Sequence, residues 1–437
     1  MAMKQKDQDS ILKKLGIKAL NPMQVAAHEA ISIESELVLL SPTGTGKTLA
    51  FLLPILSSID KNIAGVQVLI LVPSRELAIQ IEQVAMDIGS GHRVKAVYGG
   101  RSGSKDKHEM KTLPALLVGT PGRVADHIRR EVFDAGSVRV LVLDEFDKSL
   151  EVGFEEEMKE IIESLDFLDK KILTSATQKI DIPDFVQLNN HFVLDYLSEA
   201  NDKLKLVCVK SKAKDKLESL LHLLCHLGDK TGIIFCNFRD SIDFVSLYLE
   251  ENGIGHTCFH GKLEQRDRER ALIKFRNGTT RVLVATDLAA RGIDVPEMDY
   301  IIHYQIPNRE DEFIHRNGRT ARMHSEGTAY FLTHKDDKLH SFIRNYTVEE
   351  FGFGSKPIAS KWITLFISGG KKDKISKGDI AGLFFKQGDL GKDELGLIEL
   401  KQDCSFVAVP TYKSKALISK LNNVKLKKKK VRISIVE

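Results

Sequence analysis

The sequence lacks the features that mark zinc-bound, disulfide-linked and membrane-spanning proteins. It contains five cysteines: Cys208, Cys225, Cys236, Cys258 and Cys404. They form no Cys-x-x-Cys pair, which argues against a zinc site or a disulfide framework and favours a reducing compartment. No apolar run approaches the roughly 20 residues of a membrane span, and the first residues lack the apolar core of a secretory signal. We therefore expect a cytoplasmic protein without membrane contact.

Net positive charge is confined to the region near the end of the chain. The formal net charge is +4. Residues 361–437 carry 17 lysines and arginines against 8 acidic residues, a net charge of +9, whereas the remaining residues carry 47 against 52, a net charge of −5. A basic segment of this kind is expected where nucleic acid is bound.

A phosphate-binding loop is the strongest local signal. The stretch Ser41–Thr48 reads Ser-Pro-Thr-Gly-Thr-Gly-Lys-Thr and lies between the apolar run 37–40 and a helical pattern that starts at Leu49. Glycines at 44 and 46 let backbone N–H groups approach phosphate oxygens, and the helix N-terminus adds partial positive charge. Lys47 is expected to reach the outer phosphates, and the Thr48 hydroxyl to hold Mg²⁺.

An acidic pair a hundred residues later complements this loop. Asp144 and Glu145 follow the alternating aliphatic run 138–143, which places them at the carboxyl end of a strand, where ligands bind in open α/β sheets. Asp144 is suited to Mg²⁺, and Glu145 to a base that positions an attacking water. Loop and acidic pair together indicate a nucleoside triphosphatase, and the flanking strand and helix disfavour the alternative of a simple glycine turn.

The order of apolar runs predicts three domains. Two series of short aliphatic runs, in residues 1–197 and 204–350, alternate with longer mixed segments, which is typical of βαβ units around a parallel sheet. We place a hinge in the polar stretch 198–203. Residues 361–437 read βαββαβ, the order of a small α+β RNA-binding module. The fold class is therefore α/β, with two tandem parallel-sheet domains and a small C-terminal α+β domain.

Residues 10–345 resemble the DEAD-box RNA helicases. In the first domain the resemblance rests on Gln24, 41–48, 73–77, 99–100, 120–123, 144–147 and 175–177. In the second domain it rests on His260-Gly261 with Gln265 and Arg268, then 285–294 and 315–322. The resemblance implies two RecA-like domains that close around ATP and single-stranded RNA, with RNA-dependent ATPase and helicase activity.

The resemblance also assigns roles. The ATP contacts that it implies are Gln24, which reads adenine, the loop residues Thr43, Gly44, Thr45, Gly46, Lys47 and Thr48, and Asp294 from the second domain. Arg319 and Arg322 resemble arginine fingers, which fits the need for planar cations around the γ-phosphoryl oxygens. RNA-backbone contacts are implied for Pro73, Arg75, Gly100, Thr120, Arg123, Arg268, Thr286 and Gly292. Because backbone contacts carry no sequence information, we expect the two-domain core to be unspecific.

The chain departs from the family pattern in four places: the acidic motif, the adenine segment, the stretch before that segment and the arginine-finger motif. Phe146 stands where alanine is usual, and its ring needs extra room beside the site. Ile17 replaces an aromatic residue and Asn21 a threonine in the adenine segment 16–24, and no phenylalanine precedes that segment, which favours a looser adenine preference. Asn317 replaces an aliphatic residue. For His315 the sequence favours a structural role over proton transfer.

The C-terminal segment resembles the RNA-binding domain of DbpA-type bacterial DEAD-box proteins, through residues 369–379 and 388–391. This implies an RRM-like module that anchors the enzyme to large-subunit ribosomal RNA and to pre-ribosomal particles, in ribosome assembly. We expect its RNA contacts at Lys371, Lys372, Lys374 and Lys377. Phe366 and Phe406 are equally compatible with core packing and base stacking, Cys404 lies where an RRM usually has an aromatic residue, and residues 427–430 fit a charged edge strand or nonspecific phosphate contact.

Three functions are compatible with parts of the sequence. The leading one is a monomeric ATP-dependent RNA helicase that parts short duplexes locally and uses ATP and Mg²⁺. The second is an RNA-binding assembly factor with a decayed ATPase, against which the intact Lys47, Glu145 and Arg319 argue. The third, a P-loop transporter or signalling NTPase, does not account for the motifs of the second domain.

Overall fold

The structure is a computed structural model that describes residues 5–100, 110, 112–177, 182–197, 204–287, 298–320, 327–357 and 359–436. The expected hinge at 198–203 lies outside these residues. The chain separates into two compact units, the first built mainly from residues 1–203 and the second mainly from residues 204–437; the second unit contains both the second sheet and the C-terminal module. In the part of the chain that the structure describes, none of the helices combines the length and apolar character that a membrane crossing requires.

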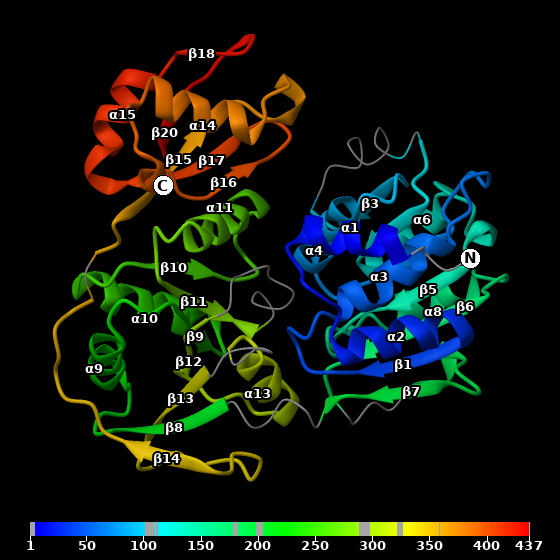
Figure 1. The fold of residues 1–437 in the computed structure, drawn as a ribbon. Helices are drawn as coiled ribbons and strands as arrows, with labels where there is room; N and C mark the ends of the chain where they lie inside the picture. Colours follow the sequence, from blue (N-terminus) through cyan, green and yellow to red (C-terminus); the bar gives the residue numbers. More distant parts are fainter. Residues whose placement is uncertain are drawn as a thin grey trace. The chain divides into compact units, whose positions relative to one another are not determined.

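The first unit is built on a seven-stranded sheet in the order β3-β4-β2-β5-β6-β1-β7 (Figure 1). All its strand pairs are parallel. The strands are β1 Glu36–Leu40, β2 Val68–Leu71, β3 Val94–Val97, β4 Leu116–Gly119, β5 Val140–Leu143, β6 Lys170–Ser175 and β7 Phe192–Asp195. The helices are α1 Gln5–Leu15, α2 Pro22–Ile33, α3 Lys47–Ser58, α4 Arg75–Ile88, α6 Pro121–Arg129, α7 Phe146–Glu151 and α8 Glu155–Glu163.

Both faces of this sheet are covered, which explains why its strands are continuous apolar runs. Successive residues of β5 alternate between two cores: Val140 and Val142 pack with residues of α3 and α4, whereas Leu141 and Leu143 pack with residues of α6 and α8. The strands are therefore held in the interior, and their carboxyl ends carry the loops that bear the motifs.

The second unit contains a sheet with the same strand order, β10-β11-β9-β12-β13-β8-β14, again parallel throughout. Its strands are β8 Leu204–Ser211, β9 Gly232–Cys236, β10 His256–Phe259, β11 Val282–Thr286, β12 Tyr300–His303, β13 Gly327–His334 and β14 Tyr346–Glu349. Its helices include α9 Leu217–Leu227, α10 Arg239–Glu251, α11 Gln265–Arg276 and α13 Glu310–Asn317. The strand order repeats that of the first unit position by position.

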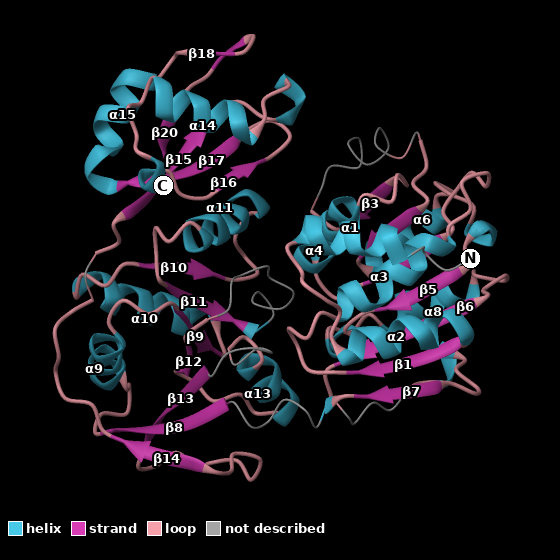
Figure 2. Cartoon of the chain, in the orientation of Figure 1, coloured by secondary structure: helices cyan, strands magenta, loops and turns pink. Residues whose placement is uncertain are grey.

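The C-terminal module is a four-stranded antiparallel sheet, β16-β17-β15-β20, with two helices (Figure 2). Its elements are β15 Trp362–Ile367, α14 Lys377–Lys386, β16 Ile398–Leu400, β17 Ser405–Pro410, α15 Ser414–Leu421 and β20 Ile433–Ile435. A two-stranded hairpin, β18 Lys425–Leu426 and β19 Lys429–Lys430, precedes the last strand. The predicted fold class, two parallel-sheet domains and a small α+β domain, is confirmed.

Candidate active site and RNA-binding surfaces

The phosphate loop connects the end of β1 to the first turn of α3. Gly44 and Gly46 have φ values of 83° and 86°, the left-handed region that glycine adopts without strain. A Cβ on Gly46 would lie 2.4 Å from Gln24 Nε2, so the loop also needs glycine for space. The Lys47 ammonium donates to the carbonyl oxygens of Ser41 at 2.5 Å and Pro42 at 2.8 Å. These features fit a cradle for phosphate groups.

Gln24 is fixed against this loop by the start of α2. Asn21 and Gln24 form a capping box, in which each side chain accepts a backbone N–H of the other residue. The remaining donors reach the phosphate loop, because Asn21 Nδ2 donates to Thr45 O at 3.0 Å and Gln24 Nε2 donates to Gly46 O at 3.2 Å. Asparagine, which replaces the family's threonine, thus caps the helix and joins it to the loop.

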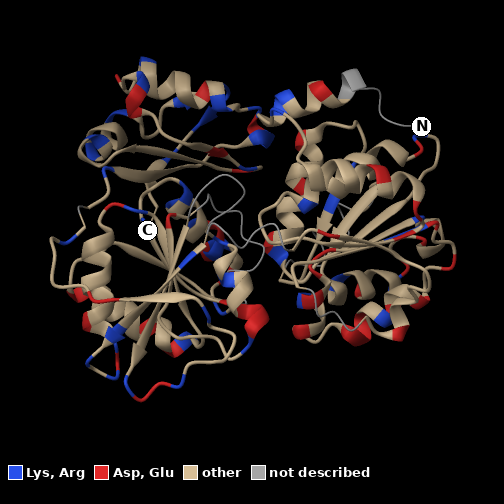
Figure 3. Cartoon of the chain, turned by 60° about the horizontal axis from the view of Figure 1, so that its bottom comes forward, with Lys and Arg blue, Asp and Glu red and all other residues tan. Residues whose placement is uncertain are grey.

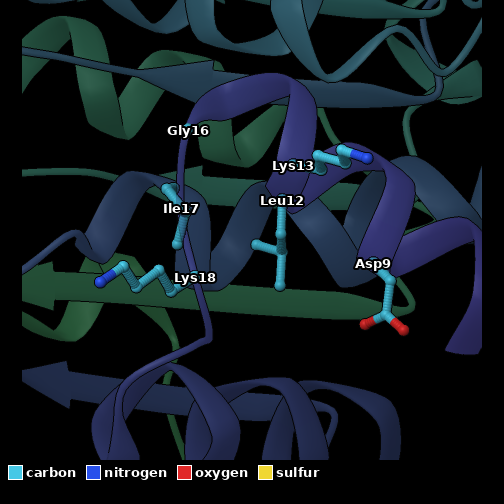
Figure 4. Close-up of a pocket in the computed structure, with 6 residues that line it drawn as sticks. All are labelled: Asp9, Leu12, Lys13, Gly16, Ile17 and Lys18. Atoms are coloured by element: carbon cyan, nitrogen blue, oxygen red, sulfur yellow. The ribbon is translucent and has the colours of Figure 1, made fainter.

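An open depression of about 400 Å³ lies where the adenine segment begins (Figure 4). Leu12 and Ile17 contribute apolar side chains, and Asp9, Lys13 and Lys18 contribute charged ones. Ile17 stands where the family has an aromatic residue, so this part of the surface offers an aliphatic contact in place of a ring.

The acidic pair and Thr174 form one hydrogen-bonded unit. Strands β5 and β6 are neighbours, with Leu143 opposite Leu173, so the next residues, Asp144 and Thr174, meet at the strand ends. The Thr174 hydroxyl donates to Asp144 Oδ1 at 2.5 Å and accepts the backbone N–H of Glu145 at 3.2 Å. Burial raises the pKa of Asp144, and the Thr174 donor and the charge of Lys47 oppose this rise.

Thr177 and Phe146 lie next to the acidic pair. Thr177 Oγ1 donates to Asp147 Oδ2 at 3.2 Å, which links the acidic motif to the motif at 175–177. Phe146 is fully buried in the core beneath α6 and α8. The extra room that its ring requires is therefore found inside the first unit.

The first unit groups the proposed ATP and RNA positions on different parts of its sheet. The phosphate loop and the acidic pair follow β1 and β5, whereas the RNA positions follow β2, β3 and β4, which lie together at one edge of the sheet. Arg75, in the first turn of α4, lies against Gly100, where a Cβ would be 2.6 Å from Arg75 Nη1. Pro73 precedes that helix, Thr120 is the N-cap of α6, and Arg123 Nη1 contacts Asp126 Oδ2 at 3.0 Å.

In the second unit the described RNA positions lie near the ends of β10 and β11. Arg268, on α11, is nearly buried, with its guanidinium 5.1 Å from the ring centroid of Phe259. Thr286 is the last residue of β11. Arg319 follows α13 and is nearly buried. Gly292, Asp294 and Arg322 lie outside the described residues.

Arg316 lies in the motif 315–322, but the sequence alone did not indicate a function for it. Its guanidinium is 1% exposed and forms a bidentate pair with Asp287, and it also donates to the Gln305 carbonyl and to Asn237 Oδ1. It therefore joins the motifs at 285–294 and 315–322. Asn317, one of the departures, is hydrogen-bonded through Oδ1 to His303 Nε2 at 3.0 Å inside the same unit.

The C-terminal module presents two groups of lysines on one joined surface. The loop 371–377 carries Lys371, Lys372, Lys374 and Lys377, all exposed. The hairpin 425–430 is held beside it, because Lys427 Nζ bonds Lys374 O at 2.7 Å and Asp379 at 2.8 Å, and Lys429 bonds Asp373 at 2.8 Å. We call this loop and hairpin the lysine surface. Blue Lys and Arg segments recur on the module in Figure 3.

The four loop lysines form no salt bridge within the described part of the chain. The two aspartates instead hold Lys427 and Lys429, and the pairing with Lys427 lowers the pKa of Asp379 to about 2. The loop ammonium groups therefore remain available to an anionic partner. The sequence did not indicate that the hairpin would join them.

Comparison with known proteins agrees with these features. Residues 21–185 match the DEAD/DEAH box helicase model, 215–324 the helicase conserved C-terminal domain and 364–435 the DbpA RNA binding domain. The ATP-dependent RNA helicase DbpA of Bacillus subtilis (strain 168) is 30% identical over 97% of this chain and 96% of its own length. Its namesake from Escherichia coli (strain K12) is 29% identical over 98% and 96%.

Solved structures show the same likeness. Saccharomyces cerevisiae Dbp5 bound to RNA and ADP BeF3 has a TM-score of 0.70 and 25% identity, over 79% of this chain and 93% of its own. Mss116 bound to single-stranded RNA and UDP-BeF has a TM-score of 0.69 and 26% identity, over 79% and 78%. The chain therefore belongs to the DEAD-box RNA helicases, and within them to those that carry a DbpA RNA-binding domain. It is an ATP-dependent RNA helicase, and the predicted resemblance is confirmed.

Proposed function

We propose that this helicase parts short RNA duplexes locally while its C-terminal module anchors it to large-subunit ribosomal RNA, in ribosome assembly. The observation that carries the proposal is the lysine surface on a module that matches the DbpA RNA binding domain. Exposed ammonium groups attract phosphates, and a small RRM-like module is suited to single-stranded loops and hairpin ends. We propose further that it acts as a monomer in the cytoplasm.

The proposed ATP site consists of the phosphate loop, the acidic pair and the finger arginines. Lys47 and the N–H groups of the loop would bind phosphate oxygens, and Gln24 would read adenine. Thr48 and Asp144 would hold Mg²⁺, largely through water, and its bound charge would neutralise that of the phosphates. Asp294, Arg319 and Arg322 keep the roles that the family resemblance implies, and Glu145 keeps the role of the base beside Asp144. The Thr48 hydroxyl and the buried Asp144 carboxylate are oxygen ligands of the kind that Mg²⁺ prefers.

Glu145 would orient the attacking water and accept its proton. Its backbone N–H is held by Thr174, and its own φ of 48° turns the chain sharply at the strand end. Arg319 and Arg322 would stabilise the charge that develops on the γ-phosphoryl oxygens. The proposed RNA positions of the core contact the RNA backbone, so sequence preference would have to come from the C-terminal module.

The test is an ATPase titration with the full chain, because removing the module would also remove its contacts with α11. Lys371, Lys372, Lys374 and Lys377 are replaced together with Ala. The matched control removes the same charge elsewhere on the module, by replacing Lys386, Lys392, Lys415 and Lys420 with Ala. In the variant that lacks the four loop lysines, half-maximal stimulation by a large-subunit ribosomal RNA fragment should need about tenfold more RNA. Its RNA affinity should also depend less steeply on salt concentration. Random RNA should stimulate the wild type, the loop variant and the control variant alike.

Two results would reject the anchoring proposal. One is a loop variant that keeps the full preference for ribosomal over random RNA. The other is an equal loss in the control variant, which would show that the bulk charge of the module matters and the loop does not.

A further inference from the structure

A buried histidine at the end of β12 contacts the helix that leads to Arg319. His303 is the last residue of β12 and is completely buried. Its ring centroid lies 4.6 Å from that of Phe313 on α13, with an interplanar angle of 22°. It also lies 6.3 Å from the ring centroid of Phe235, the residue opposite it on β9. These aromatic neighbours restrict the imidazole to one orientation.

The surroundings of His303 keep its ring neutral and decide which nitrogen carries the proton. Burial lowers the pKa of His303 to about 3, and the positive charge of Arg316 acts in the same direction. A neutral imidazole has one N–H. Nε2 lies 3.0 Å from Asn317 Oδ1, whereas Nδ1 has no hydrogen-bond partner among the described residues. Because a buried N–H is rarely left unpaired, we place the proton on Nε2, which donates to Asn317.

Asn317 begins the turn that contains Arg319. It is the last residue of α13, and Gly318 follows as the C-cap. The Asn317 carbonyl oxygen accepts the backbone N–H of Thr320 at 3.1 Å. The buried Thr320 hydroxyl in turn donates to the carbonyl oxygen of Met298. Hydrogen bonds therefore hold both ends of the turn 317–320, at Asn317 by His303 and at Thr320 by Met298.

We propose that His303 is a positioning residue for hydrolysis, because its Nε2–H fixes Asn317 and thereby the turn 317–320 that carries Arg319. The role of His303 rests on the role proposed for Arg319 as an arginine finger. An aliphatic residue at 317, which is usual in the family, could not accept this hydrogen bond. Finger arginines act on charge that develops in the transition state, so a displaced turn should lower turnover more than it lowers ATP affinity.

The test compares two amide replacements of His303 in the full-length protein. Glutamine can bring its Nε2 close to the position of the imidazole Nε2, so His303→Gln keeps a donor to Asn317. Asparagine is one carbon shorter, so His303→Asn keeps an amide that does not reach Asn317. Phosphate release at saturating RNA should have a kcat about tenfold lower in His303→Asn, as expected for a lost buried hydrogen bond, with little change in the KM for ATP. His303→Gln should restore most of this loss.

Ile302→Ala is the matched control for a loss of stability. Ile302 precedes His303 on β12 and is completely buried, but it packs with residues of α9 and α10 on the other face of the sheet. The Tm of each variant is measured, and turnover is assayed well below it. Ile302→Ala should lower the Tm and leave kcat unchanged. If Ile302→Ala lowers kcat as much as His303→Asn does, or if His303→Gln is as slow as His303→Asn, the positioning role is refuted.

A double-mutant cycle with Arg319→Ala separates the positioning role from the finger role on which it rests. If His303 acts through Arg319, adding His303→Asn to Arg319→Ala should cause little further loss of kcat, because residues that act through one group are not additive. A full additional loss of about tenfold would show that His303 acts elsewhere, and it would overturn the positioning role alone. Normal turnover of Arg319→Ala by itself would reject the finger role and the positioning role together.

Discussion

Thr174→Val tests how the acidic pair is held in place. Valine keeps the shape of threonine but has no hydroxyl. The substitution therefore removes the donor to Asp144 Oδ1 and leaves the Glu145 N–H without that acceptor. Thr174 is completely buried, so water does not readily replace the lost group. A hydrogen bond to a charged group contributes about 1.5–3 kcal/mol, and each 1.36 kcal/mol corresponds to about tenfold in rate.

We therefore expect the RNA-saturated turnover of the Val variant to fall about 10- to 100-fold, with little change in the KM for ATP. The pH profile supplies a second readout. The Thr174 donor lowers the pKa of Asp144, so its loss raises that pKa. Because the proposed role requires the ionised carboxylate, the acid limb of activity should move to higher pH.

Thr174→Ser is the matched control, because serine keeps the hydroxyl and should restore both the rate and the pH profile. The assay is phosphate release at saturating RNA and ATP across a range of pH and Mg²⁺ concentration. A Val variant with the turnover and acid limb of the wild type would refute the reasoning. Equal losses in the Ser and Val variants would also refute it, because they would attribute the effect to packing.

Three further predictions concern single residues. Glu145→Gln should keep ATP and RNA binding but nearly abolish turnover, because an amide cannot accept a proton; near-normal phosphate release would contradict the proposed base. Arg319→Ala should slow turnover by about 10³-fold or more with a smaller effect on nucleotide affinity; a change confined to affinity in a nucleotide titration would exclude a finger role. Phe146→Ala should lower the free energy of unfolding of the first unit by about 3–5 kcal/mol; an unchanged denaturant midpoint would show that the ring does not support the core.

The elements that the sequence predicted well are those with strong local patterns. The run 37–40 became β1, and the run 138–143 became β5, because both are apolar segments with loop residues on either side. The βαββαβ order of residues 361–437 is also observed, since each short alternating run there has one face in the core. In these cases local sequence and tertiary burial favour the same structure.

The contacts that the sequence missed depend on which strands become neighbours. Thr174 bonds Asp144 only because β5 and β6 are adjacent in the sheet. Arg316 reaches Asp287 across 29 residues, and Arg276 reaches Glu399 across 123. The sequence of β15 could not identify what would pack against the second face of its sheet. For Phe366 and Phe406 the sequence left packing and stacking open, and in the structure Phe406 is buried in a cluster with Ile273 and Val436, against which Phe366 packs.

The two parallel sheets share one strand order, yet the loop that we propose as the phosphate cradle follows β1 of the first sheet. In the second sheet β8 occupies the place of β1, and the residues after it, 212–216, contain no glycine. Their side chains would obstruct the close approach of backbone N–H groups to phosphate oxygens. We propose that the second domain contributes side chains such as Arg319 to hydrolysis, so that the same architecture supplies a nucleotide cradle in one domain and catalytic cations in the other.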